Sequence, residues 1–221
     1  MNIVYLIIEL LICFSVITYL YKKYSYNGLY VYATTSLVLS NLMSLKTIDI
    51  FDFTLNLGLV PFVSLFIVAN IIVQKKGIEE IKNLIIVLLI TSVLSYIILL
   101  LVSKMDSSII NQWTSASYDN IFINSPRIYF ANIVTMLYML YLNSLLYYYL
   151  KKEKNKIWIS NIVSTVIIHF FATIVFISLA YAITTKIDKI IGMLLIRYIL
   201  SIVIGLFGTI IIYINNNIKE K

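Results

Sequence analysis

The stretch LSNLMSLKTIDIFDFTLNLGLVPFVSLFIVANIIVQKKG, residues 39–77, decides the fold class of this chain. It predicts the end of one membrane helix, a short hairpin that carries Lys46, and a complete second helix that ends in a basic turn. Polar side chains interrupt its apolar parts, namely Asn41, Ser64, Asn70 and Gln74. A helix that only anchors a protein in lipid does not need such residues, so we expect part of the function to lie here.

The rest of the chain has the same apolar character. Of its 221 residues, 61% are hydrophobic and only 12% are charged, with 6 Gly and 2 Pro. A soluble domain of this size could not keep so much apolar surface from water, and the apolar runs are continuous where a β-barrel would alternate. We therefore predict an all-α, polytopic helical bundle. We expect it to lie in the lipid bilayer of a plasma membrane, of the bacterial inner-membrane type.

Seven apolar segments approach the length that a bilayer requires, which is about 20 helical residues. The expected spans are residues 3–20, 28–45, 55–74, 82–103, 127–150, 158–184 and 190–214. Six spans are the alternative, because the first two segments are short. No connection is long enough for a second domain, so residues 1–221 are expected to form one. The longest connection, 103–125, carries Ile109 and Ile121. It either rests in the membrane interface or caps a cavity, or it is an irregular connector.

The lysines and arginines between these spans predict the orientation. With seven spans, eleven of the 17 basic residues fall on one side of the membrane and five on the other, while Arg197 lies within the last span. Basic residues favour the cytoplasmic side, which places the N-terminus outside and the C-terminus inside. The net charge of +7 thus resides in short turns, and we expect no nucleic-acid partner.

Three of the expected spans carry amide side chains within their apolar faces. The sixth span places Asn161, Thr165 and His169 on one face, with Ser164 beside them, since four residues are about one helical turn. The fifth carries Asn143, and the third carries Asn70 and Gln74 as an i,i+4 pair. A cavity for a polar solute would use such stripes, and a core of interhelical hydrogen bonds would use them equally. His169 either faces a cavity or is satisfied by a neighbouring carbonyl.

Two charged residues are expected inside the bilayer. In the predicted orientation Glu9 and Arg197 both lie about 10 Å below the outer ends of their helices. An unpaired charge at this depth costs free energy, so we expect a structural Glu9–Arg197 ion pair that joins the first and last spans. The alternative is that Arg197 binds substrate.

Several blocks of the sequence resemble the queuosine precursor transporters, also described as the vitamin-uptake-transporter-like family. The first block contains Gly28-Leu29-Tyr30-Val31-Tyr32, Ser40-Asn41, Leu45-Lys46-Thr47 and Leu57-Gly58. The second contains Pro126-Arg127-Ile128, Trp158-Ile159, Asn161 and Val163-Ser164-Thr165. The resemblance implies a helical inner-membrane importer of deazaguanine precursors of a modified tRNA base. The matching positions with polar side chains are expected to bind substrate, namely Asn41, Lys46, Arg127, Asn161, Ser164 and Thr165.

The chain departs from that family at most of its ionisable positions. In the third span, the family's Asp and Glu are replaced by Asn70 and Gln74, and in the fifth its Gln and Asp are replaced by Leu140 and Asn143. In the sixth span, its Arg, Gln and Asp are replaced by Ser160, His169 and Ala172. In the last span, its Lys and Asp are replaced by Ser201 and Gly208. Amides keep hydrogen-bonding capacity but do not exchange protons near neutral pH. Asn70, Gln74, Asn143 and His169 complete the expected substrate-binding residues. Lys46 and Arg127 would lie at the outer mouth, either to attract solute or to anchor the chain in the interface.

Two classes of function are therefore open, and a third is weaker. The first is a transporter or substrate-capture protein for a small polar solute, with a separate energising subunit or a second copy as a further partner. The second is a diverged membrane scaffold whose polar stripes only pack. An intramembrane enzyme is weaker still, because the chain has a single histidine and a single cysteine, Cys13, and no nucleophile–base motif. We expect no catalytic residue, metal site or cofactor.

Overall fold

The computed structural model describes residues 2–106, 108, 110, 113, 115–119, 126–154 and 156–218. Ile109 and Ile121 of the long connection lie outside this part of the chain. The helices are α1 (Asn2–Met43), α2 (Leu59–Lys76), α3 (Glu79–Val102), α5 (Pro126–Lys154), α6 (Ile157–Tyr181) and α7 (Ile187–Asn216), and a hairpin of β1 (Thr47–Ile50) and β2 (Phe53–Asn56) follows α1. In the described residues, all six of these helices are long and apolar enough to cross a membrane. The predicted polytopic helical bundle is confirmed.

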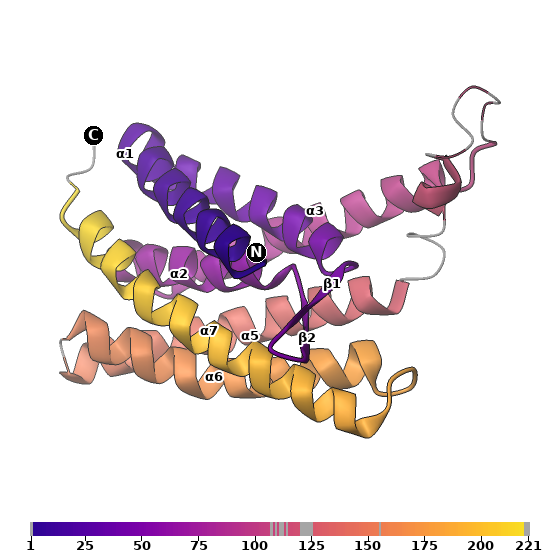
Figure 1. Ribbon diagram of the computed structural model, residues 1–221. Coiled ribbons are helices and arrows are strands. Elements are labelled where there is room, and N and C mark those ends of the chain that lie inside the picture. The colour runs from indigo at the N-terminus through magenta and orange to yellow at the C-terminus, as the bar shows by residue number, and fades with distance from the viewer. Residues whose placement is uncertain are drawn as a thin grey trace.

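Helix α1 accounts for the first two expected spans, because it is folded back on itself. Ser25 has a non-helical backbone (φ 52°, ψ −135°) and separates an arm of residues 2–24 from an arm of residues 26–43. Figure 1 shows the second arm returning beside the first. A Cβ added to Gly28 would lie 2.3 Å from the carbonyl oxygen of Leu20. In a straight helix these two residues would be about 12 Å apart, so the close approach requires both the fold and the glycine.

The hairpin predicted within residues 39–77 is present between α1 and α2, and it is a two-stranded β-hairpin. Its strands pair antiparallel from Thr47 opposite Asn56 to Ile50 opposite Phe53. The two turn residues, Phe51 and Asp52, have φ values of 49° and 66°, as a two-residue turn of this hand requires. The expected third span therefore begins later than residue 55, at Leu59. The hairpin rests on α7, where a Cβ added to Gly192 would lie 2.9 Å from the Phe53 ring.

Helix α2 is the centre of the bundle. Every residue from Leu59 to Val73 is buried, and the helix contacts α1, α3, α5 and α7. Figure 1 shows α2 behind α7, with α1 and α3 above it and the α5–α6 pair below. A helix covered on all sides has no lipid-facing stripe, which explains why its apolar residues show no helical period. Its polar residues therefore point into the protein.

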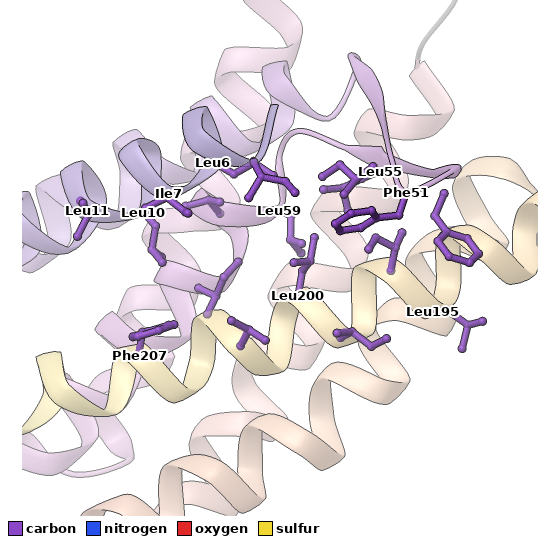
Figure 2. A pocket seen from close by; sticks show the side chains of 18 of the residues that line it. Leu6, Ile7, Leu10, Leu11, Phe51, Leu55, Leu59, Leu195, Leu200 and Phe207 are labelled. Carbon is purple, nitrogen blue, oxygen red and sulfur yellow. The ribbon is translucent and has the colours of Figure 1, made fainter. Parts of the chain in front are cut away.

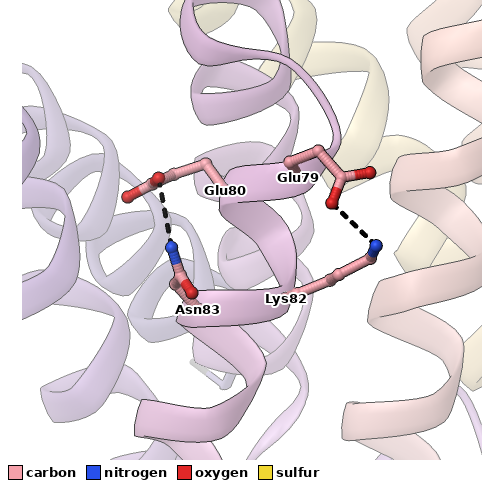
Figure 3. Close-up of polar contacts among 4 residues, drawn as sticks. All are labelled: Glu79, Glu80, Lys82 and Asn83. Atoms are coloured by element: carbon pink, nitrogen blue, oxygen red, sulfur yellow. Dashed lines mark hydrogen bonds and ion pairs between the residues drawn. The ribbon is translucent and has the colours of Figure 1, made fainter.

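The basic turn after α2 defines the lysine end of the bundle, opposite the hairpin end. Gly77 closes α2 with φ 84°, and its N–H donates to the Val73 carbonyl at 3.0 Å. Helix α3 then begins with Glu79 and Glu80, which favour a helix N-terminus. Figure 3 shows their contacts: Lys82 pairs with Glu79 at 2.7 Å, and the Asn83 amide donates to Glu80. Glu80 also accepts a 2.9 Å bond from Tyr30, which fixes the second arm of α1 against α3.

Candidate functional site

An amide ladder crosses the bundle in its lysine half. The Asn143 amide of α5 donates to Asn70 of α2 at 3.0 Å, and Asn70 donates to Asn161 of α6 at 2.8 Å. Asn161 in turn donates to two oxygens of α7, the Gly205 carbonyl at 3.0 Å and Thr209 Oγ1 at 2.9 Å. The structure thus brings together Asn70, Asn143 and Asn161, three of the expected site residues. We call these three side chains and Thr209 the amide ladder.

The ladder is buried and continues toward the lysine end. The exposed fractions of Asn70, Asn143 and Asn161 are 1%, 0% and 1%. Gln74, one turn further along α2, accepts a 3.1 Å bond from Tyr147 of α5. Asn143 Oδ1 and the neighbouring Ser144 Oγ have no hydrogen-bond partner among the described residues. The ladder therefore keeps acceptor capacity that the protein itself does not use.

A second polar layer lies about three helical turns away, at the hairpin end. The Asn132 amide of α5 donates to Asn41 at 2.6 Å and to Ser40 at 3.1 Å, both on the second arm of α1. Ser40 donates to the Gly58 carbonyl at 3.0 Å. This contact joins α1 and α5 to the start of α2. Asn41 is thus a buried member of a layer separate from the ladder.

Arg197 belongs to this hairpin-end layer. Its Nη1 donates to Asn56 Oδ1 at the end of β2, and its guanidinium lies 5.0 Å from the Phe62 ring and 4.2 Å from the Phe176 ring. The expected Glu9–Arg197 ion pair does not form: Glu9 Oε1 has no hydrogen-bond partner, and the ion pair present in the described residues is Lys82–Glu79. An amide acceptor and two aromatic faces replace the carboxylate. Glu9 lies on the first arm of α1, whose residues Leu6 and Leu10 line an apolar groove.

His169 lies beside this arginine. Its ring is 4.5 Å from that of Phe66 and 6.2 Å from that of Phe62, which also contacts Arg197. The side chain is 1% exposed, and neither ring nitrogen has a hydrogen-bond partner in the part of the chain that the structure describes. The expected neighbouring carbonyl is therefore not found. We call Asn56, Arg197, His169 and the rings of Phe62, Phe66 and Phe176 the arginine cluster.

We expect His169→Leu to change the free energy of unfolding by no more than about 1 kcal/mol, because the substitution breaks no hydrogen bond and removes two unpaired nitrogens. The lost ring contacts act in the opposite direction and have a similar size. Thermal unfolding of the purified protein in detergent measures the change. A loss above about 3 kcal/mol would mean that the imidazole has a structural partner.

The remaining expected site residues do not join either layer. Ser164 donates to the Asn161 carbonyl of its own helix at 3.1 Å. Thr165 packs against Gly205, where an added Cβ would lie 2.5 Å from its methyl group. Lys46 is exposed beside the hairpin, and Arg127 donates to Thr184 at 2.8 Å, which joins the start of α5 to the α6–α7 turn. The first two residues serve helix packing, and the last two lie at the hairpin end.

A groove of about 740 Å³ opens between the first arm of α1, the hairpin and α7 (Figure 2). Leu10, Leu59, Leu200 and Phe207 are among its lining residues, and all the lining side chains are apolar. A polar solute would lose its hydrogen bonds to water there without replacement. The groove is therefore suited to lipid chains, and the polar layers are the better candidates for solute binding.

Sequence reasoning missed Asn56, Ser40, Gly205 and Thr209 as site residues. Asn56 could have been found by asking which side chain at the depth of Arg197 can accept a hydrogen bond, since a buried guanidinium requires one. Gly205 and Thr209 are four residues apart on α7, so they share a face, but a glycine carbonyl carries no signal in a sequence.

Comparisons with known proteins bear on what these layers do. The family described as "Putative vitamin uptake transporter" matches residues 56–215 of the chain. The chain is also similar to the "Probable queuosine precursor transporter" of Bacillus subtilis (strain 168), with 23% identity over 179 residues that cover 77% of this chain and 76% of that protein. No solved structure matches significantly.

Proposed function

The chain belongs to the vitamin uptake transporter family, and from this membership we propose that it carries a small polar solute across the membrane between α2, α5, α6 and α7. The amide ladder is the observation that carries this proposal. Amide groups offer both donors and acceptors, and buried polar groups in a membrane protein mark solute pathways. Both polar layers are buried, so the proposed transporter has to open one of them to admit solute.

The proposed solute is a deazaguanine of the queuosine precursor type. The similarity to the Bacillus subtilis protein supports this choice. A purine-like ring presents donors and acceptors along one edge, and a row of amides can match both. The rings of Phe62, Phe66 and Phe176 lie in the separate hairpin-end layer, where their flat faces favour a planar ring. This proposal makes the chain a transporter with no catalytic role of its own.

Uptake of a labelled deazaguanine by cells that lack their own importer tests the proposal. Cells that express this chain should accumulate the label above the empty-vector level, and excess unlabelled guanine should compete if the ring edge is what the site recognises. Asn70→Ala should abolish the accumulation. Absence of uptake by a well-expressed, stable protein would contradict the proposal.

A non-transporting scaffold is the second candidate. One observation favours it: the ladder amides hydrogen-bond to one another and to α7, as residues that only hold helices together would do. A scaffold would show no uptake, and Asn70→Ala would then alter only its stability or its binding to a partner subunit. The energising partner of a transporter, either a separate subunit or a second copy, is part of the same proposal.

The orientation is also a proposal, with the hairpin end outside and the lysine end in the cytoplasm. Because basic residues favour the cytoplasmic side, a cysteine at Asp52→Cys in the exposed hairpin turn should react with an impermeant maleimide in intact cells. A cysteine at Lys152→Cys should react only after permeabilisation. Both variants are made in a Cys13→Ser background, which removes the chain's one cysteine. The reverse labelling pattern would show that the orientation is inverted.

A further inference from the structure

Arg197 places a permanent positive charge inside the membrane-spanning bundle. The side chain is only 2% exposed, and a guanidinium stays protonated even when it is buried. Its Nη1 donates to Asn56, but Nη2 has no hydrogen-bond partner among the described residues. The two nearest ring faces, those of Phe62 and Phe176, accept no second strong hydrogen bond. One buried NH2 group of the guanidinium therefore has unused N–H donors.

No described carboxylate pairs with this charge. The acidic residues lie in the hairpin, in the connections or at helix ends, except Glu9, and Glu9 and Arg197 form no ion pair. Asn56 contributes only the dipole of its amide, and the rings contribute only their negative faces. A buried cation without a counter-charge raises the free energy of the folded protein because it has lost its hydration. A ligand with a negative charge or a strong hydrogen-bond acceptor would offset this desolvation cost.

The groups around Arg197 fit a flat ligand with such an acceptor. His169, 1% exposed, has two unpaired ring nitrogens, and the Tyr181 hydroxyl, whose ring lies 6.1 Å from that of Phe176, is also without a partner. These polar atoms come from α6 and the guanidinium from α7. Phe62 and Phe66 of α2 complete the cluster with apolar surfaces. The cluster thus combines one cation and several hydrogen-bonding groups with aromatic faces.

We propose that the arginine cluster binds the substituent of the transported ring, selects an anionic or hydrogen-bond-accepting substituent, and rejects an ammonium group. The inference rests on the proposed function and names the substrate class of that site. A carboxylate can take the free N–H of Arg197 in a charge-assisted bond, and a nitrile or carbonyl can take it in a neutral one. An ammonium would place a second positive charge beside the guanidinium and leave the N–H unused.

Three deazaguanines that differ only in one substituent test this selection. The probes are 7-carboxy-7-deazaguanine, 7-cyano-7-deazaguanine and 7-aminomethyl-7-deazaguanine, which are anionic, neutral and cationic at neutral pH. Their dissociation constants are measured by calorimetry on the full chain in nanodiscs. We expect the carboxy and cyano compounds to bind at least about 100-fold more tightly than the aminomethyl compound, the scale of repulsion between two charges about 5 Å apart in a protein.

The outcomes separate this inference from the proposed function. Equal binding of all three compounds, or tighter binding of the aminomethyl compound, would overturn the inference and leave the transporter proposal standing. Failure of all three to bind to folded protein would overturn the proposed function and the inference with it. The ranking is measured on the unmodified chain, so it does not depend on whether a variant folds.

Two variants then assign the selection to Arg197. Arg197→Gln should reduce the preference for the carboxy over the aminomethyl compound to within about tenfold. Lys189→Gln is the matched control, because it removes the same charge from the same helix at an exposed position. The control should keep the full preference. A folded Arg197→Gln protein that also keeps it would overturn the role of Arg197.

Discussion

Asn161→Leu is expected to abolish solute uptake and to lower the free energy of unfolding by about 2 kcal/mol. The substitution removes the donor of two bonds to α7 and the acceptor of the bond from Asn70, while it nearly keeps the side-chain volume. The Asn70 amide then loses its acceptor in a site that excludes water. Uptake falls further than stability, since the same amide row is proposed to bind the solute.

The matched control for this prediction is Asn83→Leu. Asn83 is an exposed amide on α3 whose bond to Glu80 is long, at 3.4 Å. The same chemical change there should leave both uptake and stability close to those of the unmodified protein. Initial uptake rates, normalised to the amount of protein in the membrane, and unfolding in detergent provide the two readings. An Asn161→Leu protein that transports normally would place the solute pathway elsewhere.

Gly28→Val is expected to prevent correct folding. The added Cβ would lie 2.3 Å from the backbone oxygen of Leu20 and 2.6 Å from its carbonyl carbon. Backbone atoms cannot move aside as a flexible side chain can, so the two arms of α1 must separate, at a cost above about 3 kcal/mol. The second arm carries Ser40 and Asn41, so the hairpin-end layer would be lost with it.

Ser25→Gly is the control in the same turn. Ser25 has φ 52°, a conformation that glycine adopts more readily than serine. This variant should fold at least as well as the unmodified chain, and it should be more stable by up to about 1 kcal/mol. The yield of monodisperse protein in detergent and its unfolding midpoint compare the two variants. A Gly28→Val protein with normal yield and midpoint would contradict the close approach of the arms.

The sequence predicted the membrane helices well because their signal is local. A run of about 20 apolar residues is sufficient evidence of a span, and each expected span overlaps a helix or, for the first two, an arm of α1. The hairpin beside Lys46 was also predicted, but its two β-strands were not, because they contain only four residues each. Short apolar segments of this kind do not distinguish strand from helix.

The site was predicted in part. Helical spacing was sufficient to place Asn161 and His169 on one face, and Asn70 and Asn143 proved to be partners of Asn161. Spacing within one helix could not predict which faces of different helices meet inside the bundle. Depth estimates placed Glu9 and Arg197 at a similar level, but equal depth does not bring two side chains to the same side of a bundle. Arg197 points inward to Asn56, and the first arm of α1 borders the apolar groove.

Solute exchange by the purified chain in proteoliposomes tests the central claim most directly. Vesicles loaded with unlabelled 7-cyano-7-deazaguanine exchange it for external label without an energy source, so no energising subunit is needed. We predict that vesicles with the unmodified chain accumulate label above the level of protein-free vesicles, and that vesicles with Asn161→Leu do not. Accumulation no higher than in protein-free vesicles, by a chain that is folded and inserted, would contradict transport through the polar layers.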